Sequence, residues 1–270
     1  MRQTLRIFVL FVSVTCAWVV PVHAAGLPDE IQVFADEAAD PGEFEVDLHF
    51  NTTRGRAQPA RFLGEAPIDR GVRFTPEITY GVSTSLQVSL HLPLVYTAPA
   101  NGVKSNFALA GYKLEAKWMP VQYSNEEGKL FIGSRFEYSN IAPRFDNARQ
   151  QLEVRPIVGW RGEKWLFAGN AIFKRNLSRD VLGELDPYWE GSFAFKALRD
   201  IGKKWAVGGE YFTEFGRVRK PEPWREQNNT VYLVADYSGK PFKFNLGIGH
   251  GLTPASPRWT LKGAISLEFD

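Results

Sequence analysis

The chain has 270 residues, of which 32 are Lys or Arg and 30 are Asp or Glu, so its net charge is close to zero. This balance argues against a nucleic-acid partner, which needs a basic face, and against an acidic solvating tail. Aromatic residues make up 14% of the chain, a share that would suit the aromatic girdles of a membrane barrel.

The first 24 residues have the order of a secretory signal peptide. Arg2 and Arg6 give a positive start, Ile7 to Val20 is almost wholly apolar, and Val22 to Ala24 offers a small-residue cleavage site. The apolar run has about fourteen residues, whereas a membrane-spanning helix needs roughly 20, so an uncleaved anchor is the less favoured alternative. Cleavage would remove Cys16, the only cysteine, and leave 30 basic and 30 acidic residues in the mature chain.

Residues 25–42 lie between this leader and the first expected strand, and they are rich in acidic residues. A calcium site needs clustered oxygen ligands, but the spacing of these acids matches no known binding loop. We therefore expect residues 25–42 to form a solvated periplasmic segment. The alternative is that the segment enters the barrel lumen as a plug.

From residue 43 onwards, apolar and polar residues alternate with a period of two, which predicts strands with two different faces. Between Gly111 and Met119, for example, Leu114 and Trp118 alternate with Lys113 and Glu115. The expected strands lie at about 43–51, 72–80, 85–96, 107–119, 129–139, 149–160, 164–175, 187–199, 203–215, 227–237, 241–250 and 258–269.

The connections between these strands alternate in length. Gly81–Thr84, Arg161–Glu163 and Ser238–Lys240 are tight, and Pro120–Gly128 is the longer exception among them. The intervening connections, such as Thr52–Gly71, are mostly long. Outer-membrane barrels have an even number of strands, short periplasmic turns and longer outer loops. The pattern predicts an all-β fold, a transmembrane antiparallel up-and-down β-barrel of about 12 strands over residues 43–270, with both termini periplasmic.

Three prolines conflict with this prediction. Pro76, Pro93 and Pro156 fall inside expected strands, and proline cannot donate a hydrogen bond to a closed ladder. Either bulges absorb these prolines or the strand boundaries differ there.

The face opposite the apolar one carries charges of both signs, which are costly against lipid and therefore should line the lumen. They could form the charged constriction of a channel, or they could be ion pairs that fill a non-conducting structural or envelope-assembly barrel. The expected lumen-lining residues are Lys113, Glu115, Lys117, Arg135, Glu137, Glu153, Arg155, Glu210 and Glu214.

No catalytic, metal-binding or phosphate-binding motif stands out, so neither an enzyme nor a cofactor is expected. An outer-membrane lipid hydrolase would need a serine and a histidine that meet on the wall. His250 and the nearby Ser256 are the candidates for that alternative, although no acidic partner is evident. A soluble periplasmic lipid-binding barrel is a further alternative.

Several short motifs resemble a proteobacterial outer-membrane family that is catalogued under the MetA pathway of phenol degradation. The motifs are Ile31–Phe34, Pro41–Phe44, Arg73–Glu77 with Tyr80–Val82, Leu92–Leu94 and Lys113–Lys117. The resemblance implies a transporter or channel of the outer membrane, with aromatic or hydrophobic compounds as the expected cargo. Asp270 departs from the aromatic ending that is common among barrels.

The sequence thus favours an outer-membrane barrel that gives passive or facilitated passage to small molecules. The partners expected for it are outer-membrane lipid, small-molecule solutes and the barrel-assembly machinery.

Overall fold

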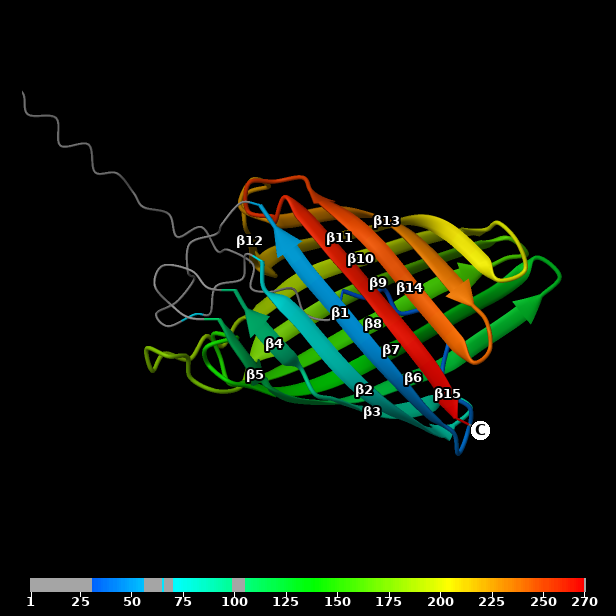
Figure 1. Ribbon diagram of the computed structural model, residues 1–270, viewed down its shortest axis with the longest axis horizontal. Coiled ribbons are helices and arrows are strands. Elements are labelled where there is room, and N and C mark those ends of the chain that lie inside the picture. The colour runs from blue at the N-terminus through cyan, green and yellow to red at the C-terminus, as the bar shows by residue number, and fades with distance from the viewer. Residues whose placement is uncertain (1–30, 56–64, 66–69, 99–104, 270) are drawn as a thin grey trace, which may run out of the picture.

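The computed structural model describes residues 31–55, 65, 70–98 and 105–269, and these residues form a tilted, closed β-barrel (Figure 1). The predicted signal peptide lies outside the described residues. No described helix is long and apolar enough to cross a membrane.

Twelve antiparallel strands form the wall, which confirms the predicted fold class and strand number. Each strand pairs with its neighbours in the chain, and β1 closes the barrel by pairing with both β2 and β15 (Figure 1). A short strand, β12 (Lys220–Pro221), pairs with β11. The wall strands are β1 (Phe44–Arg54), β2 (Val72–Ser83), β3 (Leu86–His91) with β4 (Leu94–Thr97), β5 (Asn106–Leu109) with β6 (Gly111–Asn125), β7 (Gly128–Ile141), β8 (Gln150–Arg161), β9 (Trp165–Asn176), β10 (Trp189–Asp200), β11 (Trp205–Arg217), β13 (Asn228–Ser238), β14 (Phe242–Gly251) and β15 (Trp259–Phe269).

The prolines that conflict with the strand pattern lie at interruptions of the ladder. Pro93 separates β3 from β4, and the carbonyl of Pro76 on β2 faces this break, where it accepts the Leu92 N–H at 2.9 Å. Pro156 pairs with Ser134 on β7, but the β8–β9 register skips the position of Pro156. The positions at which proline lacks an N–H group therefore lie at gaps in the ladder rather than at intact hydrogen-bonded pairs.

One connection was predicted wrongly. Pro120–Gly128 was expected to be a long turn, but β6 continues to Asn125 and only residues 126 and 127 link it to β7. A register shift between Trp118 and Val121 accommodates Pro120. The bulge provides the extra residue that lets the strand continue past a proline.

The connections confirm the predicted alternation. Residues 84–85, 126–127, 162–164, 201–204 and 239–241 join strands at one end of the barrel, which we call the short-turn end. The longer connections, including 142–149 and 177–188, lie at the opposite long-loop end. The last strand finishes at the short-turn end (Figure 1). That this end is periplasmic remains a prediction.

The outer face of the barrel is apolar and the inner face is polar, the reverse of a water-soluble protein. Buried side chains inside the barrel include Arg135, Lys113 and Asn170. A continuous apolar exterior suits a hydrocarbon environment. Each wall strand contributes at least one exposed apolar or aromatic side chain, including Leu48, Ile78, Val88, Leu114, Phe136, Val158, Phe167, Phe193, Trp205, Leu233, Ile248 and Leu261.

Aromatic side chains gather on the outer face near both ends of the strands. At the short-turn end, the Trp205 ring lies 5.1 Å from that of Tyr237 and 5.4 Å from that of Phe244, measured between centroids. Towards the long-loop end, the Tyr112 and Tyr138 rings lie 6.5 Å apart. Such belts suit the two interfaces of a bilayer, where one end of the ring is apolar and the other is wet.

Candidate functional site: the barrel lumen

Strand register places charges of one sign in rows that cross the lumen wall. Glu115, Glu137 and Glu153 stand opposite one another on β6, β7 and β8. A parallel row contains Lys117, Arg135 and Arg155. Like charges directly across a ladder repel one another, so stability depends on contacts between the two rows rather than within them.

Arg135 makes these contacts between the rows. Its Nε lies 2.6 Å from Glu115, its Nη1 lies 2.8 Å from Glu153, and its Nη2 pairs with Glu137. Arg155 also pairs with Glu153, at 2.8 Å, and Lys113 lies 3.5 Å from Glu137. Arg135 is only 2% exposed, so three carboxylates surround one buried guanidinium. We call this set the Arg135 network.

A second network of opposite polarity lies across the lumen on β10, β11, β13 and β15. The buried Glu210 carboxylate pairs with Lys196 at 3.1 Å and also with Lys262. Lys196 lies 3.6 Å from Asp236 as well. We call this set the Glu210 network, because its centre is a single carboxylate between two lysines.

Two histidines face the lumen from β1 and β3, the strands on either side of β2. The Nε2 of His49 lies 2.8 Å from Glu77 Oε2, while the Nε2 of His91 lies 3.6 Å from Glu77 Oε1 and 2.9 Å from Glu115 Oε2. Among the histidines, the sequence pointed only to His250 as a candidate functional residue. His49 alternates with the apolar Leu48 and Phe50 in the sequence, but only the barrel register brings these four side chains together.

The segment before β1, residues 31–42, runs inside the barrel. Its backbone is held by wall side chains at four points in turn: Lys262 donates to the Ile31 carbonyl at 2.9 Å, Arg155 to the Gln32 carbonyl at 3.2 Å, and Lys117 to the Glu37 carbonyl. Asn170 both accepts from the Phe34 N–H, at 2.8 Å, and donates to the Phe34 carbonyl, at 3.0 Å. This is the placement that the sequence left open as an alternative to a solvated segment, and we call residues 31–42 the inner segment.

The side chains of the inner segment add to this anchoring. The Phe34 ring is buried, with the Arg135 and Arg155 guanidinium groups 4.7 and 5.1 Å from its centroid, as expected for cation–π contacts. Asp36 pairs with Arg161 at 2.9 Å and with Lys129 at 3.0 Å. Burial raises the pKa of the Asp36 carboxyl, but the hydrogen bonds and charges of Arg161 and Lys129 outweigh burial and leave it below its usual value of 3.8.

The predicted lumen residues fall into two groups. Glu214 is exposed and accepts a hydrogen bond from Asn228 at 3.2 Å, nearer the long-loop end. The others are buried inside the barrel: Lys113, Glu115, Lys117, Arg135, Glu137, Glu153, Arg155 and Glu210.

His250 and Ser256, the residues of the hydrolase alternative, serve separate structural contacts. The His250 ring packs against Trp259, with centroids 4.6 Å apart. The Ser256 hydroxyl donates to the Asn229 carbonyl and accepts from the Asn229 N–H, both at 2.8 Å. The serine hydroxyl thus fastens the loop before β15.

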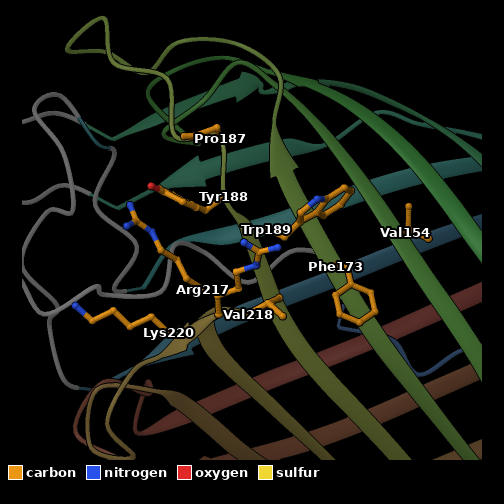
Figure 2. A pocket seen from close by; sticks show the side chains of 9 residues that line it. Val154, Phe173, Pro187, Tyr188, Trp189, Arg217, Val218 and Lys220 are labelled. Carbon is orange, nitrogen blue, oxygen red and sulfur yellow. The ribbon is translucent and has the colours of Figure 1, made fainter.

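Two cavities lie on opposite sides of the wall. A small lumen cavity of about 100 Å³ is lined by Ile31, Phe212 and Tyr232 together with charged side chains such as Arg155. A larger cavity of about 820 Å³ is shown in Figure 2. It is lined by Val154, Phe173, Pro187, Tyr188, Trp189, Arg217, Val218, Arg219 and Lys220.

The larger cavity belongs to the outer face near the long-loop end. Val154 and Phe173 stand opposite one another, and they alternate with Glu153 and Lys174, which line the lumen cavity. Because neighbouring residues of a strand point to opposite faces, Val154 and Phe173 point outwards. The larger cavity is therefore not part of a path through the barrel.

Comparisons with known proteins agree with the architecture. An outer membrane channel from Pseudomonas putida F1 has a TM-score of 0.57 and 12% identity, over 89% of this chain and 100% of that chain. The NanC porin has a TM-score of 0.52 and 8% identity, over 83% of this chain and 99% of that chain. No protein-family model matches, and the curated proteins contain no significant match. What this chain shares with these two proteins is the closed antiparallel barrel of outer membrane proteins.

Proposed function

We propose that this protein is an outer-membrane channel that gives passive or facilitated passage to small molecules. The observation that carries the proposal is the reversed polarity of the barrel, with exposed apolar side chains outside and buried charged side chains inside. A charged inner wall is the kind of surface along which water and polar solutes can move, whereas an apolar outer wall suits lipid. The two channel structures of similar fold are consistent with this proposal.

The proposed cargo is a small aromatic or otherwise hydrophobic compound that also carries a polar group. The lumen cavity combines Phe212 and Tyr232 with Arg155 and Lys174, so it offers apolar surface and charge side by side. Binding pockets commonly pair an apolar lining with a few polar groups that fix orientation. The resemblance to the family catalogued under phenol degradation supports the same class of cargo.

The inner segment suggests how passage is controlled. It occupies the lumen between the Arg135 and Glu210 networks, and both networks hydrogen-bond or stack with it. In the proposed channel, release of the inner segment widens the path. The same observation favours a second candidate function, a non-conducting structural or envelope-assembly barrel, if the segment never leaves.

Planar-bilayer recording of the refolded mature protein distinguishes these two functions. We expect discrete conductance steps from the wild-type protein, and larger steps from Phe34→Ala, because this substitution removes the ring that stacks on the lumen arginines. Small aromatic carboxylates and phenols, added to one side, should reduce the ion current if they share the path.

Phe44→Ala is the matched control, because Phe44 lies on the outer face and is exposed. Its conductance should equal that of the wild-type protein. A protein that shifts on a heat-modifiability gel, as folded barrels do, but remains silent with and without Phe34→Ala would refute the channel and favour the structural barrel. Conductance with no effect of any aromatic solute would keep the channel and refute the proposed cargo.

A further inference from the structure

The proposed channel makes no use of His49, Glu77 and His91, which together with Glu115 of the Arg135 network we call the histidine–glutamate cluster. They come from β1, β2, β3 and β6, which are adjacent in the sheet, so the register of three neighbouring strand pairs brings them together. All four are buried on the lumen side, and the histidine side chains are 8% and 1% exposed. A conducting path needs charge at its surface, but it does not need two buried imidazoles that share one carboxylate.

The spacing of the nitrogen and oxygen atoms suits a metal ion. Bonds of roughly 2.1 Å in a tetrahedral zinc site place neighbouring ligand atoms about 3.4 Å apart. In the cluster, His49 Nε2 lies 2.8 Å and His91 Nε2 lies 3.6 Å from oxygens of Glu77, and His91 Nε2 lies 2.9 Å from Glu115. Small side-chain rotations would therefore convert these contacts into coordination.

Glu115 has a buried oxygen that the polar contacts of the barrel leave unused. Both Arg135 and His91 approach the same atom, Glu115 Oε2. Among the described residues, Glu115 Oε1 is buried and has no hydrogen-bond partner. A buried carboxylate oxygen without a partner is costly, and a bound cation is one of the few features that would compensate for it.

The nearby charges also favour a cation. Asp47 stands directly opposite Glu77 in the β1–β2 register, and its carboxylate lies within 4.8 Å of ligand atoms of His49 and Glu77. A second set of ligand atoms with the same spacing consists of Glu77, His91 and Glu115. Glu77 belongs to both sets, so it is the centre of the cluster.

We infer that the histidine–glutamate cluster binds one divalent transition-metal ion of the zinc class. Glu77, His91 and Glu115 are the proposed ligands, because their ligand atoms all lie within 4.8 Å of one another, and His49 Nε2, 2.8 Å from Glu77 Oε2, orients the Glu77 carboxylate. Imidazole nitrogen with carboxylate oxygen suits zinc, copper or nickel, whereas calcium and magnesium take oxygen ligands. His91 binds through Nε2, so the proton that Nε2 donates to a carboxylate in the metal-free state moves to solvent or to Nδ1.

The test uses the tag-free mature protein, refolded in detergent, and Zn²⁺ alone as the probe. Equilibrium dialysis followed by elemental analysis should give one zinc per chain, and Co²⁺ should give the intense visible absorption of a four-coordinate site. His91→Gln, which removes a ligand, should weaken zinc binding by more than the roughly 10–100-fold that loss of an outer-shell partner costs at metal sites, and His49→Gln should weaken it by about that factor.

His250→Gln is the matched control, because His250 packs on Trp259 on the outer face. It should bind zinc as the wild-type protein does. A heat-modifiability gel establishes folding for every variant, and Glu77→Gln replaces any histidine variant that fails to fold. Failure of the folded wild-type protein to bind zinc, or equal loss in His250→Gln, would overturn the inference. Neither outcome bears on conductance, so the proposed channel is tested separately.

Discussion

The Arg135 network and the Glu210 network both stabilise a buried central charge with surrounding groups of opposite charge. In the first, one guanidinium lies among three carboxylates, and in the second, one carboxylate lies between two lysines. Both centres are buried inside the barrel. Both networks also contact the inner segment, through the Phe34 ring and through the Ile31 carbonyl.

The stability of the barrel should therefore depend more on the central charge of each network than on the charges around it. Removing a peripheral group leaves the centre with other partners, whereas removing the centre leaves several like charges together in a buried place. An uncompensated buried charge costs far more than a lost surface ion pair. The two networks differ because the lysines of the Glu210 network have further partners. Lys196 also pairs with Asp236, and Lys262 also donates to the Ile31 carbonyl.

The largest effect is expected for Arg135→Met. Loss of the guanidinium leaves Glu115, Glu137 and Glu153 facing one another, so the free energy of unfolding should fall by about 3–5 kcal/mol. Urea unfolding in lipid vesicles, followed by tryptophan fluorescence, measures this. Arg149→Met is the control, since Arg149 is exposed, and it should change stability by no more than about 0.5 kcal/mol. Equal losses in the two variants would contradict the central role of Arg135.

A smaller effect is expected for Glu210→Gln. The two lysines lose their shared carboxylate, but Asp236 and the Ile31 carbonyl remain as partners, so the loss should be about 2–3 kcal/mol. The same urea experiment applies, with the exposed Glu214→Gln as the control. A loss of stability as large as that of Arg135→Met would show that Asp236 and the Ile31 carbonyl contribute little, and would contradict the expected difference between the two networks.

The smallest effect is expected for Asp36→Asn, which weakens the attachment of the inner segment to the barrel wall and leaves Arg135 and Glu210 unchanged. The ion pair with Arg161 is partly exposed, so its loss should weaken the docking of the inner segment by about 1 kcal/mol, which is a roughly fivefold change in the docking equilibrium. Val33→Cys provides the reporter, because the predicted mature chain has no other cysteine. Thiol labelling of Cys at this position should become faster in Asp36→Asn and remain unchanged in Asp40→Asn, whose side chain is exposed.

The same reporter gives a pH dependence. The docked Asp36 has a pKa below its usual value of 3.8, so its contribution to docking is fully present above that pH and is lost as the pH falls through the lowered pKa. Labelling of the wild-type reporter should therefore rise only under strongly acidic conditions. In Asp36→Asn this acid-induced rise should be absent or reduced, and an undiminished rise would assign the effect to another group.

Much of the fold could be predicted from the sequence because a strand that faces lipid on one side and a polar interior on the other must alternate. The alternation placed Lys113, Arg135 and Glu153 on the inner face without reference to their partners. The tight connections likewise followed from local turn chemistry. Pro120–Gly128 was expected to be a longer turn, whereas a bulge lets β6 continue past Pro120 to Asn125.

The candidate site could be predicted only as a set of inward-facing residues. The sequence pointed to His250 because it lies near a loop serine, and it gave no sign of His49 and His91, which the register of β1, β2 and β3 brings to one carboxylate. The role of Asn170 was also invisible, because its two hydrogen bonds go to a backbone 136 residues away in the chain.

The sequence by itself determined which side chains face lipid and which face the interior, since that information is local and repeats every two residues. Only the tertiary structure decided which interior charges meet, because partners such as Glu210 and Lys262 are set by strand register and barrel closure. It also decided that residues 31–42 lie within the lumen. Glu37 and Asp40 keep their exposure, while Asp36 is buried against Arg161, and Lys117 and Arg155 supply donors to the backbone of the segment, which make its burial favourable.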